Sequence, residues 1–166
     1  MTLRRALPYV LYAIAHVAFV AWVFIAAGGL FGESLYERAV EGTRVPPGLL
    51  RSIAIVESRE LDTVIGDDGI SLGRFQLNEN FRAWREARWG KHNPLEPLQA
   101  GRVAARILEY NYRALGRWDC AIAAYRQGVD GVRRGGPTWW YVKRVCKAWA
   151  CLVVEGKIKR NTWRGK

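Results

Sequence analysis

Apolar positions along the chain divide it into one long uncharged run and a series of shorter amphipathic segments. The run covers residues 6–31. Beyond it, helical periodicity and the placing of Pro, Gly and Asn predict helices at 47–59, 74–89, 95–115, 119–127 and 138–154. Loops are expected at 60–73, 90–94 and 128–137, with at most a short β-turn region near residues 64–71. The pattern therefore predicts an all-α, mainly helical domain.

The uncharged run predicts a transmembrane anchor, because about 20 helical residues suffice to span a bilayer. Arg4 and Arg5 precede the run and acidic residues follow it, which places the N-terminus inside and the remainder on the periplasmic or extracytoplasmic side. A cleaved signal peptide is the alternative, although its apolar region usually spans only about 7 to 15 residues. A fully buried soluble helix is a third interpretation.

The expected organisation is an anchor at 1–31, a juxtamembrane stalk at 32–45, one domain at 46–154 and a basic tail at 155–166. The formal net charge of the 166 residues is +11. Residues 117–166 carry twelve basic against three acidic side chains, whereas residues 32–116 carry twelve of each. No nucleic-acid-binding signature accompanies this charge. The tail therefore suits envelope polyanions, or is simply solvated.

The predicted helix at 47–59 carries the candidate chemistry. Leu50, Ile53 and Glu57 fall on one face, so the carboxyl group shares its surroundings with aliphatic side chains. Burial favours the protonated form of such a carboxyl group, as a general acid for glycosidic cleavage requires. A glutamate at this place in a helix is more often a solvated surface residue, so the segments downstream decide the matter.

Four further segments follow Glu57-Ser58 in order. They are Ser71-Leu-Gly73-Arg-Phe-Gln76, Asn93-Pro94 with Gly101 after it, Ala121-Ile-Ala-Ala-Tyr125-Arg126-Gln-Gly128, and Thr138-Trp-Trp-Tyr141-Val-Lys-Arg-Val145. Each is weak alone, but together in this order they form a specific signal. Over residues 46–150 the chain resembles the catalytic (SLT) domain of the bacterial lytic transglycosylases, the lysozyme-like family that cleaves murein.

The resemblance implies a lysozyme-like fold whose cleft crosses the end of the glutamate helix. It implies cleavage of the β-1,4 bond between N-acetylmuramic acid and N-acetylglucosamine in peptidoglycan, with Glu57 acting first as acid and then as base to leave a 1,6-anhydro end. No metal or cofactor is required. The substrate-binding residues implied by the resemblance are Ser58, Ser71, Gly73, Gln76, Tyr125, Arg126 and Tyr141.

The chain departs from the family pattern at several positions. Arg126 stands where the family has Asn, and Pro137 stands where an acidic residue often precedes the Thr. Arg74-Phe75 replaces the frequent Leu-Met. These changes bear on sugar contacts and subsite preference more than on the chemistry, because Glu57 is retained.

Three other interpretations remain open. A goose-type muramidase would use water as the nucleophile, with Asp62, Asp67 or Asp68 as the second carboxylate, although an Asp-Asp-Gly turn more often has only a structural role. A non-catalytic wall-binding module would keep the fold without needing Glu57. A small membrane protein of a secretion or phage assembly would cleave the wall only locally.

Two residue types leave further alternatives. Cys120, Cys146 and Cys151 lack the spacing of a zinc site, and they either include one disulfide or remain free thiols. Among the eight tryptophans, Trp139 and Trp140 beside Tyr141 are the candidates for contact with sugar rings. Four other tryptophans, in contrast, lie at positions that suit the hydrophobic core; these are Trp84, Trp89, Trp118 and Trp149.

Overall fold

The structure, a computed structural model, describes residues 34–154. The predicted anchor (1–31) and basic tail (155–166) lie outside the described residues. Among the residues that are described, no helix combines the length and the apolar character needed to cross a membrane.

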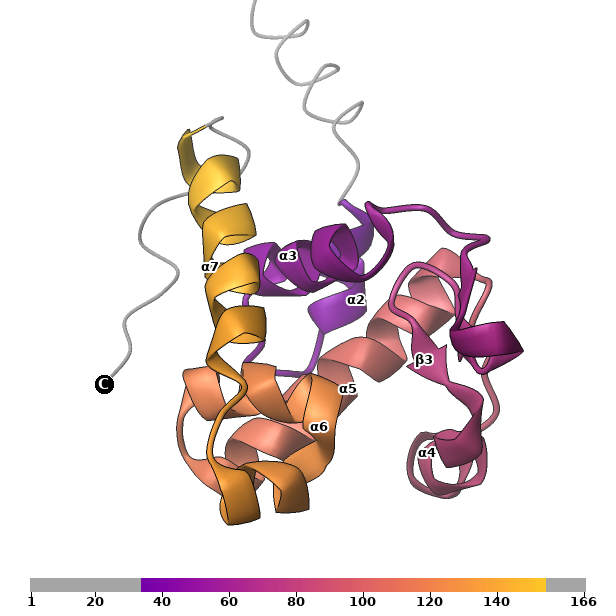
Figure 1. Ribbon diagram of the computed structural model, residues 1–166. Coiled ribbons are helices and arrows are strands. Elements are labelled where there is room, and N and C mark those ends of the chain that lie inside the picture. Colours follow the sequence, from indigo (N-terminus) through magenta and orange to yellow (C-terminus); the bar gives the residue numbers. More distant parts are fainter. Residues whose placement is uncertain (1–33, 155–166) are drawn as a thin grey trace, which may run out of the picture. The chain divides into compact units, whose positions relative to one another are not determined.

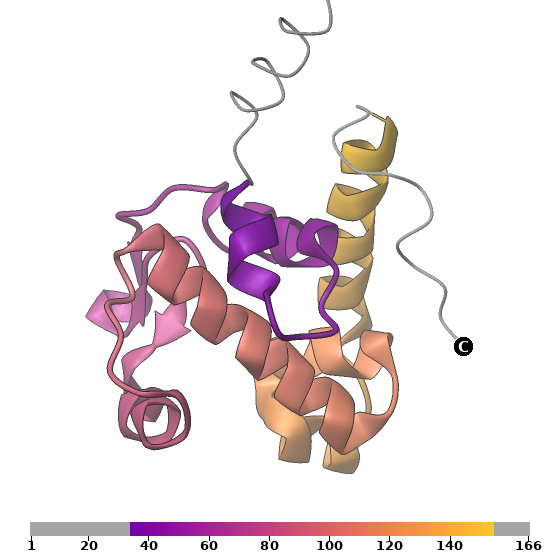
Figure 2. The same ribbon diagram turned by 180° about the vertical axis from the view of Figure 1, so that it is seen from behind.

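The described part of the chain is mainly helical, as the sequence predicted. The helices are α2 (Leu35–Val40), α3 (Pro47–Ser58), α4 (Arg82–Trp89), α5 (Pro97–Leu115), α6 (Trp118–Gly135) and α7 (Trp139–Val154). In Figure 1, α3 lies between α7 on one side and the small sheet with α4 on the other. Figure 2 shows from behind how α5 crosses next to α2. Helix α3 packs against α7 and α2, and α5 packs against α2 and α6.

Helix α2 corrects the predicted stalk. Tyr36, Ala39 and Val40 are buried in the same core as α3 and α5. The contact with α5 is close, because a Cβ atom added to Gly101 would lie 2.9 Å from the Cβ of Ala39. The stalk prediction over 32–45 is therefore wrong from Leu35 onward, because the compact unit begins at that residue.

The segment between α3 and α4 corrects the predicted helix at 74–89. It forms an antiparallel three-stranded sheet of β1 (Ile65–Gly66), β2 (Ser71–Leu72) and β3 (Leu77–Asn78), with 3₁₀ turns at Asp67–Gly69 and Glu79–Phe81. Gly73 and Gln76 have φ angles of +71° and +46°. These left-handed residues turn the chain between β2 and β3, so the α-helix begins only at Arg82.

Helix α6 is longer than the predicted 119–127. Gly128 interrupts it with φ +75° and ψ 160°, but helical structure resumes and continues to Gly135. The second part of α6 is retained by apolar contacts, since Val132 is buried and Val129 packs against the core. The expected loop is thus limited to the three residues 136–138 that separate α6 from α7.

Candidate active site

Glu57 lies in the last turn of α3, at the boundary between the core and the exterior. The face of α3 beneath it is fully buried through Leu50, Ile53 and Ala54. The helix ends because Arg59 adopts the left-handed conformation, and its N–H donates to the Ile55 carbonyl at 3.1 Å. Glu57 itself is half-buried. Its carboxyl group thus emerges from an apolar surface, as the sequence periodicity predicted.

Two tyrosines of the predicted site meet at this point from different helices. Tyr141, on α7, is buried, and its hydroxyl donates a short hydrogen bond to Oε1 of Glu57. Tyr125, on α6, donates to the Phe75 carbonyl at 2.9 Å. Burial, and then the charge of Glu57, raise the pKa of both phenols well above their usual range. Both phenols therefore remain protonated donors around neutral pH.

The pKa of Glu57 reflects opposing effects. Burial raises it and is the largest contribution, whereas the hydrogen bond from Tyr141 and the charges of Arg126 and Arg144 lower it. The charge of Asp67 raises it further. The net result is a raised pKa, which retains the proton to higher pH than an ordinary glutamate does. The groups that act on Glu57 come from α6, α7 and the turn after β1.

The hydroxyls of the two predicted serines bond within the protein. Ser58 is buried and donates to the Arg74 carbonyl at 2.8 Å, which joins the end of α3 to the turn before β3. Ser71 is buried too and donates to Oδ2 of Asp67 at 2.6 Å. In this structure Ser58 therefore holds the backbone next to Glu57, whereas Ser71 holds the side chain of Asp67.

Gly73 and Gln76 fix the shape of the same turn. A Cβ atom on Gly73 would lie 2.1 Å from the Pro94 carbonyl oxygen, so the close approach of the Asn93-Pro94 segment requires glycine. The Gln76 amide donates to the carbonyls of Val64 at 3.1 Å and Gly73 at 2.9 Å. The Ser-x-Gly-x-x-Gln motif thus builds the sheet that lies beside the glutamate.

A polar network that sequence reasoning missed braces the loop after α3. The guanidinium of Arg74 donates to Asp62 at 2.6 Å and to the Tyr36 hydroxyl at 2.8 Å. Tyr36 in turn donates to Glu60 at 2.5 Å, and Arg51 donates to Glu60 at 3.0 Å. Burial opposes ionisation of Glu60, but these donors hold its pKa below the usual range. Arg74, which stands where the family often has Leu, therefore binds Asp62 and Tyr36 within the domain.

The three aspartates proposed as a second carboxylate differ in their surroundings. Asp62 is paired with Arg74, and Asp68 is exposed on the turn. Asp67 is the one whose charge acts on Glu57, and it accepts the Ser71 hydrogen bond. Asp67 is accordingly the aspartate in this group best placed to influence the reaction.

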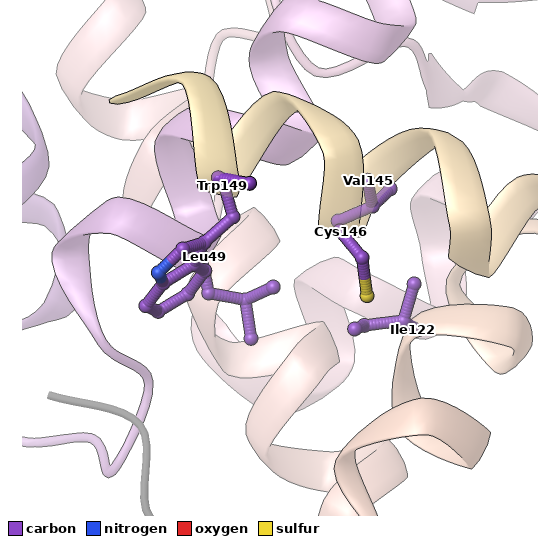
Figure 3. A pocket seen from close by; sticks show the side chains of 6 residues that line it. Leu49, Ile122, Val145, Cys146 and Trp149 are labelled. Atoms are coloured by element: carbon purple, nitrogen blue, oxygen red, sulfur yellow. The ribbon is translucent and has the colours of Figure 1, made fainter. Parts of the chain in front are cut away.

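Two hollows lie apart from this carboxylate. One is apolar, about 150 Å³ in volume, and Figure 3 shows Trp149 of α7, Leu49 of α3 and Ile122 of α6 around it. The other is polar, about 370 Å³, and lies between α4 and the start of α5, with His92 and Asn93 among its residues. Neither hollow includes Glu57.

Comparison with known proteins identifies the class to which this fold and site belong. The structure has the mainly helical fold expected of the lysozyme-like enzymes, with a half-buried glutamate at the end of a core helix. The family model described as the transglycosylase SLT domain matches residues 34–136, and the chain therefore belongs to this family. No curated protein and no solved structure matches the chain at a significant level. Helix α7, which supplies Tyr141, follows the matched residues.

The hydrogen bond from Tyr141 leads to a prediction about pH dependence. The bond stabilises ionised Glu57, so Tyr141→Phe should raise the pKa of Glu57 further. A ¹³C NMR titration of glutamate-labelled protein measures this shift directly. Tyr110→Phe, an exposed position on α5, is the matched control. An unchanged or lowered pKa in Tyr141→Phe would contradict the balance described above.

Proposed function

We propose that this protein is a peptidoglycan lytic transglycosylase that cleaves the β-1,4 bond between N-acetylmuramic acid and N-acetylglucosamine. Membership of the SLT family gives glycan-cleaving activity on peptidoglycan at the level of the family. The observation that carries the specific proposal is Glu57, a half-buried carboxyl group with a raised pKa, held by the Tyr141 hydroxyl.

In the first step, protonated Glu57 donates its proton to the glycosidic oxygen as the bond breaks. Burial supports this role because it raises the pKa of the carboxyl group, which then retains its proton to a higher pH than an ordinary glutamate does. The 2-acetamido group of the substrate's muramic acid stabilises the electron-deficient sugar carbon that results. Such a step needs one acid from the protein rather than two carboxylates across the bond.

In the second step, the Glu57 carboxylate takes the proton from the muramic 6-hydroxyl, whose oxygen then closes the 1,6-anhydro ring. The Tyr141 hydroxyl and the charges of Arg126 and Arg144 favour this ionised form. The groups that lower the pKa of Glu57 therefore favour the carboxylate form, which is the base that the second step requires. Glu57 ends protonated, ready for another strand.

A muramidase is the second candidate, and Asp67 is the observation that favours it. A hydrolase needs a group to orient water on the far side of the bond, and Asp67 lies near enough for its charge to raise the pKa of Glu57. However, Asp67 is engaged by Ser71 at 2.6 Å in the turn between β1 and β2. We therefore favour a role for Asp67 in the geometry of that turn.

Glu57→Gln tests the catalytic acid. The amide keeps the size of the side chain and an acceptor for Tyr141, but cannot deliver a proton, so wall cleavage should fall by roughly 10²–10⁴-fold or more. Release of soluble fragments from purified sacculi measures the loss. Glu86→Gln, the same change on α4, should cleave like the wild type. Wild-type turnover by Glu57→Gln would show that another residue is the acid.

The same variant should fold at least as stably as the wild type at neutral pH. The folded-state pKa of Glu57 is raised, so its contribution to stability is fully present below the unfolded-state pKa and is lost as pH rises through the folded-state value. Glutamine does not ionise and avoids that loss. Denaturant unfolding of both proteins is therefore the control that separates lost catalysis from lost structure.

The mass of the released muropeptides separates the two enzymatic candidates. Ring closure by the 6-hydroxyl should give products that weigh one water less than those of lysozyme, and Asp67→Asn should lose activity only modestly. Asp68→Asn, at an exposed position on the same turn, is the matched control. Reducing ends on the products, together with a collapse of activity in Asp67→Asn, would favour the muramidase.

We further propose that the N-terminal run anchors the protein in the membrane, with the SLT domain on the extracytoplasmic side next to its substrate. The support is the uncharged stretch at 6–31 preceded by Arg4 and Arg5. An intact mass measured on the membrane fraction should include the run. A shortened protein in the soluble envelope fraction would instead establish a signal peptide.

A further inference from the structure

Arg126 contacts the indole of Trp140, the residue before the tyrosine that is bonded to Glu57. Its guanidinium Cζ is 4.8 Å from the centroid of the Trp140 ring, on the adjoining helix α7. The Trp140 ring meets the Tyr141 ring edge-on at 5.9 Å, and Tyr141 donates to Glu57. A chain of direct contacts therefore connects the exposed guanidinium on α6 to the proposed catalytic carboxylate.

Arg126 and Arg144 differ from the arginines that brace the domain. Arg74 and Arg85 each form an ion pair with a nearby carboxylate. Within residues 34–154, Arg126 and Arg144 are exposed and neither forms an ion pair. Their charges nevertheless both act on Glu57. Each of these two exposed cations thus influences Glu57 without an ion-pair partner among the described residues.

The indole beside them supplies the second requirement for binding a sugar. Trp140 is 50% exposed, so part of its ring is open to a ligand. Indole rings pack against the apolar faces of sugars, and an adjacent guanidinium pairs with a carboxylate through two parallel N–H donors. The asparagine that the family pattern has in place of Arg126 offers a hydrogen bond without this charge.

We propose that Arg126 and the indole of Trp140 form a subsite that binds a carboxylate of the glycan strand next to the bond cleaved at Glu57. The inference rests on the proposed function and specifies its substrate. Peptidoglycan offers this carboxylate from two sources. In strands without stem peptides it is the free lactyl group of muramic acid, and in substituted strands it belongs to the peptide.

Calorimetric titration in the Glu57→Gln background tests the subsite without cleavage of the ligand. The ligands are an N-acetylglucosamine oligomer, a peptide-free alternating oligosaccharide, the same oligosaccharide with its lactyl carboxylates amidated, and the peptide-bearing form. Adding Arg126→Asn should weaken binding of a carboxylate-bearing ligand by about 1.5- to fivefold, the range expected for one exposed charge pair. Binding of the uncharged and amidated oligomers should not change.

Three further variants isolate the cause. Arg126→Lys keeps the charge but loses the paired donors, so it should recover part of the affinity. Arg106→Asn removes the same charge from an exposed position on α5 and should bind like its parent. Trp140→Leu should weaken binding of all four ligands, because stacking does not depend on the carboxylate. Retained binding of the uncharged oligomer shows that each arginine variant is folded, and denaturant unfolding provides the same control for Trp140→Leu.

The outcomes separate the inference from the proposed function. A loss confined to the peptide-free oligosaccharide assigns the lactyl carboxylate, and a loss confined to the peptide-bearing form assigns the stem peptide. Equal loss on charged and uncharged ligands, or no loss at all, overturns the carboxylate subsite while glycan binding itself survives. If the Glu57→Gln protein binds none of the glycans, the proposed function fails instead.

Discussion

Burial of the Glu57 carboxyl group raises its pKa, and the Tyr141 hydroxyl with two arginines opposes that shift without reversing it. Burial alone would hold the proton but make the anion costly, whereas donors and cations alone would leave an ordinary ionised glutamate. A residue that serves first as acid and then as base needs both effects together. The rest of the site is arranged around this balance, with α3 supplying the carboxyl group and α6 and α7 the opposing groups.

Most motif residues act on the backbone that surrounds the glutamate. Ser58 ties the end of α3 to the turn at Arg74, and the Gln76 amide joins Val64 to Gly73. Gly73 permits close approach of the Pro94 carbonyl. These contacts are partly buried, and together they resist displacement of the sheet relative to α3. A family motif can therefore specify a catalytic site mainly by fixing the backbone around the catalytic residue.

Arg74, Phe75 and Arg126 depart from the family pattern, and their contacts divide them into two groups. Arg74 and Phe75 face inward, where Arg74 pairs with Asp62 and Phe75 is fully buried in the core. Arg126 instead remains exposed against Trp140. A substitution that faces inward alters how the backbone near Glu57 is held. An exposed cation on Trp140 instead alters what the site can bind. For this reason Arg126 carries the inference about substrate.

The sequence by itself determined the glutamate helix, because apolar spacing and the Pro46-Pro47 start are local signals within one element. It also determined the family, through the order of its motifs. It could not determine the role of Tyr36, since a six-residue helix such as α2 shows too little periodicity to reveal a buried face. The predicted helix at 74–89 failed similarly, because the left-handed conformation of Gln76 is imposed by its side-chain bonds across the turn.

Only the tertiary structure decided the electrostatics of the site. Tyr141 and Glu57 are 84 residues apart in the chain, and Arg74 and Tyr36 are 38 apart. Residue spacing shows which side chains share a face of one helix, but not which faces of separate helices meet. The pKa of a carboxyl group depends on every charge and donor around it and on how much water it loses. That environment exists only when α3, α6 and α7 are packed together.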